Sequence, residues 1–262
     1  MTQKTLKVRD KDTIAYNKTT GKSKTLPGVM FLGGFHSDMT GTKATFLEEK
    51  CAQRHQSYVR FDYTGHGQSG GRFEEGNIST WLSDAEAVLE KLTSGPQILV
   101  GSSMGGWIAL LLALKRPERL KGLVLLAPAP DFSEDIYYEE FGEEERRHLA
   151  LKGTVYRPNN YGEPYPLTKQ LFEDAKKHLL LDRRHLLYVP LRIIHGKEDP
   201  DVPWEKSEEI LESFVSPDAK VYWVEDGDHR LSRPEDLELI NETVVGLSQL
   251  PRLEAAKEQG KN

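Results

Sequence analysis

The stretch ILVGSSMGGW, residues 98–107, decides the fold, because an apolar run, the pattern G-x-S-x-G and a second apolar run follow one another. The pattern occurs around Ser103 and again around Ser69, in GHGQSGG at 65–71. A nucleophilic serine in this pattern needs a strand that ends just before it and a helix that begins just after it. Ser103 meets both requirements, whereas Ser69 lies in a glycine-rich loop with no apolar helix behind it. We therefore expect Ser103 to be the nucleophile and Ser69 to be a loop residue.

Short apolar runs alternate with longer amphipathic segments over most of the chain. We expect strands at 5–9, 13–17, 29–32, 58–63, 97–100, 120–128, 190–196 and 219–225, and helices at 41–53, 78–92, 106–116, 204–214 and 234–247. This alternation is typical of an α/β fold with a mostly parallel eight-stranded sheet that has helices on both faces. Right-handed crossovers then place the loops that follow the strands at one edge of the sheet, where such folds bind ligands.

The alternation stops where acidic and aromatic residues crowd together. We interpret this segment as a helical lid inserted over the ligand edge. The predicted organisation is an α/β core at 1–130 and 185–250, a lid at 131–184 and a charged C-terminal tail at 251–262.

Composition excludes several classes of protein. The formal net charge of −6 argues against nucleic acid or an anionic membrane as the main partner. Cys51 is the one cysteine, so an intramolecular disulfide and a zinc site with several thiolates are both impossible. No apolar run reaches the ~20 residues of a membrane span, and the first residues lack the apolar segment of a signal peptide. We expect a soluble intracellular protein; the composition makes no prediction of its oligomeric state.

The general base and its acid partner are expected from later strand-end loops, in the order Ser, Asp, His. His229 follows the last strand in EDGDHRL and is the predicted base. His195 is the alternative, although Gly196 after it suggests a role in a turn. For the acid we choose Asp199 in HGKEDPDVPW from its distance to the strand end, with Asp201 as the alternative.

Five stretches carry a resemblance to a known family: FLGGFHSDMTGTKA (31–44), RFDYTGHGQSGG (60–71), GPQILVGSSMGGW (95–107), HGKEDPDVPW (195–204) and DGDHR (226–230). They resemble the α/β-hydrolase superfamily, and within it the branch that contains the mitochondrial abhydrolase-domain S-depalmitoylase and acyl-glucuronide esterase.

The resemblance implies a catalytic triad and an oxyanion hole. Ser103 would be the nucleophile, Asp199 the orienting acid and His229 the base, with the backbone N–H groups of Phe35 and Met104 as oxyanion donors. The residue pattern itself supports Met104, because this residue follows the nucleophile at the start of a helix. Neither a metal nor an organic cofactor is implied.

The implied function is hydrolysis of carboxylic esters or thioesters, with an acylated protein or a small acyl molecule as the substrate. A monoacylglycerol-lipase-like enzyme or a general carboxylesterase is the enzymatic alternative, and a catalytically silent ligand-binding protein is the alternative of another class. Gly33 stands where relatives have proline, His66 where they have a small residue, and the lid differs. These departures leave the catalytic assignment intact and bear on the acyl-chain preference.

A substrate pocket is predicted from Gly34, Trp107, Tyr137, Phe141 and Trp204, with further aromatic residues of the lid as walls: Phe132, Tyr138, Tyr156, Tyr161 and Tyr165. The alternative is that these rings pack the lid onto the core, and core packing is favoured for Trp107.

The expected location is the cytoplasm, because the first strand begins too close to residue 1 for a mitochondrial transit peptide. A mature form of an organellar relative would instead lie in the mitochondrial matrix.

Overall fold

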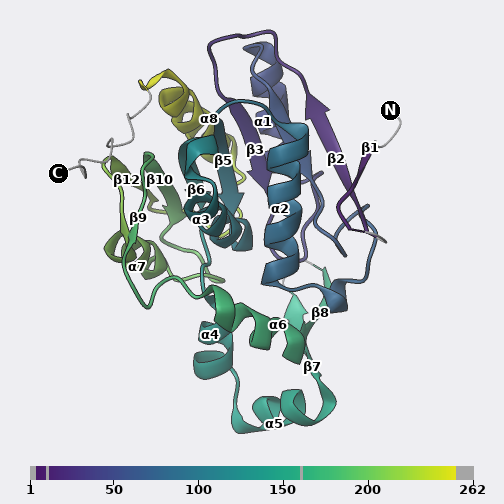
Figure 1. Cartoon of the computed structure of the whole chain (residues 1–262). Coiled ribbons are helices and arrows are strands. Elements are labelled where there is room, and N and C mark those ends of the chain that lie inside the picture. The colour runs from purple at the N-terminus through teal and green to yellow at the C-terminus, as the bar shows by residue number, and fades with distance from the viewer. Residues whose placement is uncertain (1–3, 10–11, 160–161, 252–262) are drawn as a thin grey trace, which may run out of the picture.

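An eight-stranded sheet forms the centre of the computed structural model, which describes residues 4–9, 12–159 and 162–251 (Figure 1). The strands follow one another across the sheet as β1 (Lys4–Lys7), β2 (Thr13–Thr19), β4 (Tyr58–Phe61), β3 (Gly28–Leu32), β5 (Gln97–Ser102), β6 (Leu120–Leu126), β10 (Leu191–Gly196) and β12 (Ala219–Val224). β2 runs antiparallel to β1 and β4, and every other neighbouring pair is parallel. The predicted mostly parallel sheet is confirmed.

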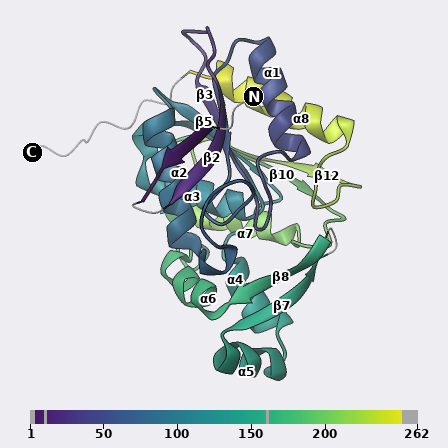
Figure 2. The same cartoon turned by 90° about the vertical axis from the view of Figure 1, so that its right-hand side faces the viewer.

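Helices cover both faces of the sheet (Figures 1 and 2). One face carries α2 (Ile78–Leu92), α3 (Met104–Lys115) and α7 (Glu205–Ser213), and the other carries α1 (Thr42–Gln53) and α8 (Pro234–Gln249). Within β5, Leu99 packs in the first of these two cores, whereas Ile98 and Val100 pack in the second. Since side chains alternate along a strand, a strand buried on both faces must be apolar throughout, which explains the unbroken run in the sequence.

The boundaries around Ser103 are tighter than expected. β5 extends to Ser102 and α3 begins at Met104, so a single residue separates strand from helix. By contrast, α2 has the bounds predicted for it, and the Asn77 side chain accepts a hydrogen bond from the N–H of Thr80 as an N-cap.

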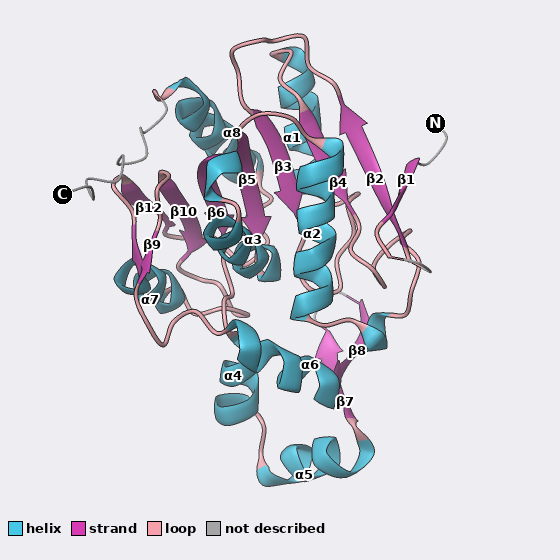
Figure 3. Ribbon diagram, viewed as in Figure 1, coloured by secondary structure: helices cyan, strands magenta, loops and turns pink. Residues whose placement is uncertain are grey.

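Residues 131–184, here called the insert, lie beyond the carboxyl ends of the parallel strands (Figure 3). The insert holds α4 (Phe132–Asp135), a π-helical turn (Ile136–Glu140), α5 (Glu143–Lys152), the antiparallel pair β7 (Thr154–Asn159) and β8 (Gly162–Thr168), and α6 (Lys169–Ala175). The expected helical lid therefore contains a pair of strands as well as its helices. Three prolines at 158, 164 and 166 exclude a helix there, whereas a two-stranded ribbon tolerates them because its outer edges are unpaired.

Smaller elements complete the described chain. A two-stranded parallel sheet joins β9 (His185–Leu186) to β11 (Phe214–Val215), and 3₁₀ turns lie at Phe73–Glu75, Pro117–Arg119 and Lys176–His178. Of the predicted tail, 252–262 lies outside the described residues.

The two ends of the insert are joined through one carboxylate. Oδ2 of Asp131, at the first position of the insert, accepts hydrogen bonds from the N–H groups of Leu180 and Leu181 at 2.9 Å each. Asp131 is buried and has a φ of 58°, a conformation in which Asp and Asn are enriched among residues other than glycine. Near the same end, the indole N–H of Trp107 donates to the carbonyl oxygen of His178 at 3.0 Å.

Replacing Asp131 tests this junction. Asp131→Ala leaves two N–H groups without an acceptor and should lower the free energy of unfolding by about 1–3 kcal/mol, as measured by urea denaturation. Asp131→Asn keeps one acceptor oxygen and tolerates the positive φ, so it should lose less. Equal transition midpoints for the Ala variant and the unmodified protein would contradict this account.

Candidate active site

Ser103 lies alone between β5 and α3 in a strained conformation, with φ 55° and ψ −121°. Its N–H donates to Leu126 O at 2.9 Å, and its carbonyl oxygen accepts from the N–H groups of Gly106 and Ala129 at 2.8 and 3.1 Å. These bonds hold the backbone of Ser103 at both its N–H and its carbonyl group, while the residue stays partly exposed. Strain held in place by its surroundings is typical of functional residues.

The two glycines of the pattern are required by close backbone contacts. A Cβ on Gly105 would lie 2.1 Å from Leu32 O on β3, and one on Gly101 would lie 2.4 Å from Gly105 O. Any side chain at either position would push the start of α3 away from the sheet and open the turn that presents Ser103.

Ser69 lies in a different environment from that of Ser103. Its hydroxyl donates to Asp62 O at 2.7 Å and accepts from the N–H of Ala15 at 2.8 Å, which ties the glycine-rich loop to β2. These contacts are those of a structural loop residue.

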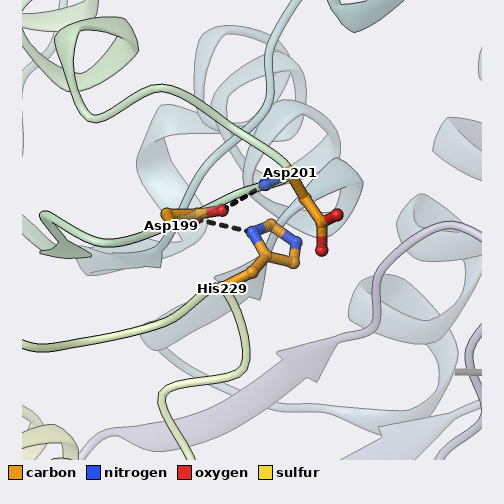
Figure 4. Close-up of side chains that lie close together, drawn as sticks. All are labelled: Asp199, Asp201 and His229. Carbon is orange, nitrogen blue, oxygen red and sulfur yellow. Dashed lines mark hydrogen bonds and ion pairs between the residues drawn. The ribbon is translucent and has the colours of Figure 1, made fainter. Parts of the chain in front are cut away.

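Asp199, rather than Asp201, is bonded to His229 (Figure 4). Its Oδ2 lies 2.7 Å from His229 Nδ1, and its Oδ1 accepts the N–H groups of Asp201 and Val202 at 2.8 and 2.9 Å. The Asp199 side chain is fully buried, whereas Asp201 is exposed.

Asp199 is ionised at neutral pH despite this burial. Burial alone would raise the pKa of Asp199, but hydrogen bonds from His195 and His229 outweigh it and hold the pKa well below its usual range. A carboxylate at Nδ1 requires the proton of the neutral imidazole to be on that nitrogen, which leaves the lone pair on Nε2. His229 is thus in the tautomer of a general base.

Two loops meet closely to bring acid and base together. A Cβ on Gly196, at the end of β10, would lie 2.1 Å from Gly227 O in the loop after β12. In that second loop Asp228 Oδ1 accepts the N–H of Arg230 at 3.0 Å, and Nζ of Lys43 on α1 donates to Arg230 O. Burial, with the nearby Arg230 charge, lowers the pKa of Lys43 to about 8.

The predicted oxyanion donors lie on both sides of Ser103. Met104 is the first residue of α3, where N–H groups have no acceptor within the helix. Phe35 follows Gly34, and a Cβ on Gly34 would lie 3.3 Å from Ser103 Cβ. Among the hydrogen bonds of the described residues, neither the Phe35 nor the Met104 N–H donates to another part of the chain.

Ser103 and His229 are not hydrogen-bonded to each other in the described part of the chain. Catalytic contacts of this kind are often long before the substrate binds and tighten in the complex.

His66 and His36 form a contact that the sequence did not predict. The N–H of His36, directly after Phe35, donates to His66 Nε2 at 3.2 Å. Burial lowers the pKa of His66 to about 4, so its imidazole is neutral at pH 7 and can accept this bond. His66 therefore supports the loop that carries the Phe35 N–H.

The Phe35 ring lies among four other aromatic rings. Their centroids are 5.0 Å away for Phe73, 5.7 Å for Trp81, 5.6 Å for Phe132 and 5.4 Å for Tyr165. Phe132 and Tyr165 belong to the insert, so the insert contacts the predicted oxyanion loop directly.

Two tryptophans predicted to bind substrate have structural partners. Trp107 is fully buried and packs edge to face on Phe132. Trp204 packs edge to face on Trp223 of β12, with Nζ of Lys197 5.9 Å from its ring. The favoured interpretation of Trp107 as a core residue agrees with its burial.

The other predicted aromatic residues of the insert differ in their surroundings. Tyr137 and Phe141 both pack against Phe172 of α6, inside the insert, whereas Tyr138 and Tyr156 are exposed. Tyr161 lies outside the described residues. Substrate binding by Gly34, Trp107, Tyr137, Phe141 and Trp204 stays a prediction.

Asp199, Asp201 and His229 each offer one possible metal-ligand atom, all within 4.8 Å of one another. Both oxygens of Asp199 already accept hydrogen bonds, which a cation would have to displace. This donor set therefore favours acid–base chemistry.

A cavity of about 540 Å³ lies elsewhere, at the amino ends of β3, β5 and β6, and shares no lining residue with the Ser103 site. Within the described chain, no helix has the length and apolar character needed to cross a bilayer.

Comparisons with known proteins give the relatives of the chain. Residues 27–171 match the family described as "Serine aminopeptidase, S33". Human palmitoyl-protein thioesterase ABHD10, whose name places it in mitochondria, is 35% identical over 240 residues, which cover 91% of this chain and 77% of that protein. The cytoplasmic location of this chain stays a prediction.

Solved structures show the same relationship. A hydrolase from Agrobacterium vitis S4 has a TM-score of 0.89 at 38% identity, covering 95% of this chain and 98% of that one. ABHD10 from mouse has a TM-score of 0.85 at 33% identity, covering 94% and 98%. The sheet, the turn at Ser103 and these relatives together show that the chain belongs to the α/β-hydrolase family of serine hydrolases.

Proposed function

We propose that this serine hydrolase is an acyl thioesterase that acts on palmitoyl-protein thioesters and related fatty-acyl thioesters, with Ser103, Asp199 and His229 as its triad. The observation that carries the triad is the 2.7 Å contact between Asp199 and His229 at the edge of the sheet where the strained Ser103 turn ends. The substrate class is supported by the relative at 35% identity, whose name is palmitoyl-protein thioesterase.

The reaction proceeds in two steps through an acyl-enzyme. Ser103 Oγ attacks the thioester carbonyl carbon while His229 Nε2 takes its proton, and Asp199 holds the imidazole in the required tautomer. The N–H groups of Phe35 and Met104 stabilise the oxyanion, each contributing ~3 kcal/mol if comparable donors are a guide. His229 then protonates the leaving thiolate and activates the water that hydrolyses the acyl-enzyme.

The insert serves as a lid that shapes the acyl site. Phe132 and Tyr165 pack on the Phe35 ring, so the insert and the oxyanion loop share one aromatic cluster. An acyl chain that reaches Ser103 passes beside these rings, which offer the apolar surface that such a chain needs.

A panel of matched substrates tests the substrate class. Palmitoyl and shorter acyl thioesters should be hydrolysed with higher kcat/KM than oxygen esters of the same acyl chains, and Ser103→Ala should hydrolyse none of them. Faster turnover of monoacylglycerols or short oxygen esters than of any thioester would assign the enzyme to lipases or carboxylesterases instead.

Labelling with a fluorophosphonate tests the nucleophile. Mass spectrometry of the labelled, digested protein should place the adduct on Ser103, and Ser103→Ala should not be labelled. Ser69→Ala is the matched control: it should still be labelled, although the loss of two hydrogen bonds should lower its stability by about 1–3 kcal/mol. A folded Ser69→Ala protein that is not labelled would overturn the assignment of Ser103 as the nucleophile. Failure of the probe to label the original protein would also overturn it, and would favour a catalytically silent ligand-binding role.

Two neighbouring aspartates test the acid. Asp199→Asn removes the carboxylate that fixes the His229 tautomer and should lower kcat by about 10⁴-fold. Asp201→Asn removes the negative charge of an exposed carboxylate whose oxygen lies within 4.8 Å of a His229 ring nitrogen. It leaves the bond between Asp199 and His229 Nδ1 in place, so it should keep kcat within about tenfold of the original. Steady-state kinetics on both variants measure these effects. A large loss of kcat in Asp201→Asn with a small loss in Asp199→Asn would identify Asp201 as the acid.

A further inference from the structure

His195, on β10, is a second histidine behind the candidate acid and takes no part in the mechanism above. It is fully buried, and its ring contacts three polar groups of the segment that leads from β10 into α7. A buried imidazole with all of its polar atoms engaged is fixed in orientation.

The contacts of His195 define its tautomer. Nε2 lies 3.1 Å from Val202 O and 3.3 Å from Asp199 Oδ2, and neither oxygen carries a proton at neutral pH. Nε2 must therefore hold a proton. Nδ1 lies 2.7 Å from Ser207 Oγ in the first turn of α7, and the hydroxyl can donate to it.

Asp199 Oδ2 thus lies near two imidazole nitrogens, and the N–H of His195 Nε2 is shared between Val202 O and this oxygen. His229 Nδ1 is 2.7 Å away and His195 Nε2 is 3.3 Å away, while Oδ1 accepts two backbone N–H groups. The backbone donors hold one oxygen, and His195 Nε2 lies beside the other oxygen, which accepts from His229.

We propose that His195 is a positioning residue for catalysis, which orients Asp199 toward His229 and disperses part of its negative charge through an Nε2–H donor. The proposal rests on the triad assigned above. The effect of His195 is electrostatic as well as steric. Without this donor, the Asp199 carboxylate attracts a protonated His229 more strongly, and this attraction favours the inactive, protonated form of the base.

Several charged groups surround the same site. Asp201 approaches His229 from the β10–α7 loop, Asp228 and Arg230 flank it in its own loop, and Lys43 reaches that loop from α1. A substitution at His195 leaves all of these charges in place, so a change in the pH profile reports on the contacts that His195 itself makes, with Asp199, Val202 and Ser207.

The experiment is the pH dependence of kcat/KM for the unmodified enzyme, His195→Phe and His195→Gln, each corrected for its folded fraction by circular dichroism. His195→Phe keeps the ring but removes the donor. We expect its kcat/KM to fall by about 10- to 100-fold and its acid limb to move to higher pH by about half a unit or more. His195→Gln offers an amide N–H near the position of Nε2 and should restore most of the rate and the position of the limb.

The proposal would be overturned if the acid limb of the pH profile did not move in His195→Phe and if both variants lost the same amount of rate. This result would show that His195 serves only in packing. Nitrogen-15 NMR of the unmodified enzyme is a second test, which does not depend on whether a His195 variant folds. A protonated Nε2 on His195 is expected, and a tautomer with its proton on Nδ1 alone would contradict the proposal. Failure of the triad itself is distinguishable, because Ser103→Ala and Asp199→Asn would then stay active.

Discussion

The contact between the first turn of α3 and the end of β3 is the constraint on which the site depends. Gly105 lies so close to Leu32 O that no side chain fits there, and this closeness allows one residue, Ser103, to make the whole turn from strand to helix. The positive φ of Ser103 is tolerated because its peptide is held by Leu126 on the neighbouring strand. The same turn places Met104 directly after Ser103 at the start of α3, so the proposed nucleophile and one proposed oxyanion donor depend on a single packing contact.

The rest of the site is built from loops that are held at their backbones. Gly196 and Gly227 touch, and hydrogen bonds converge on both oxygens of Asp199. On the other side of Ser103, an aromatic cluster holds Phe35, and two of its rings come from the insert. The proposed acid and base are therefore held by polar contacts within the core. The loop with the proposed oxyanion donor Phe35 instead packs against the part of the chain that we assign to substrate selection.

The sequence predicted what depends on local pattern. The turn at Ser103 and the order of strands and helices in the core each need only neighbouring residues, and each agrees with the structure. The prolines of the insert argue against a helix there, but the pairing of β7 with β8 depends on a register that composition does not encode. The position of His195 was similarly hidden, because a histidine before a glycine at a strand end looks like a turn residue until the loop folds back and brings Asp199 to its ring.

The central claim is that the Ser103 hydroxyl, the N–H groups of Phe35 and Met104, and the imidazole of His229 surround one reacting carbon. A crystal structure of the enzyme after reaction with an alkyl phosphonate tests it most directly, because the adduct mimics the tetrahedral intermediate. We expect the phosphorus on Ser103 Oγ, one phosphonyl oxygen within hydrogen-bond distance of both N–H groups, and His229 Nε2 facing Oγ. An adduct whose oxygen points away from Phe35 and Met104, or an imidazole that remains out of reach, would contradict the account.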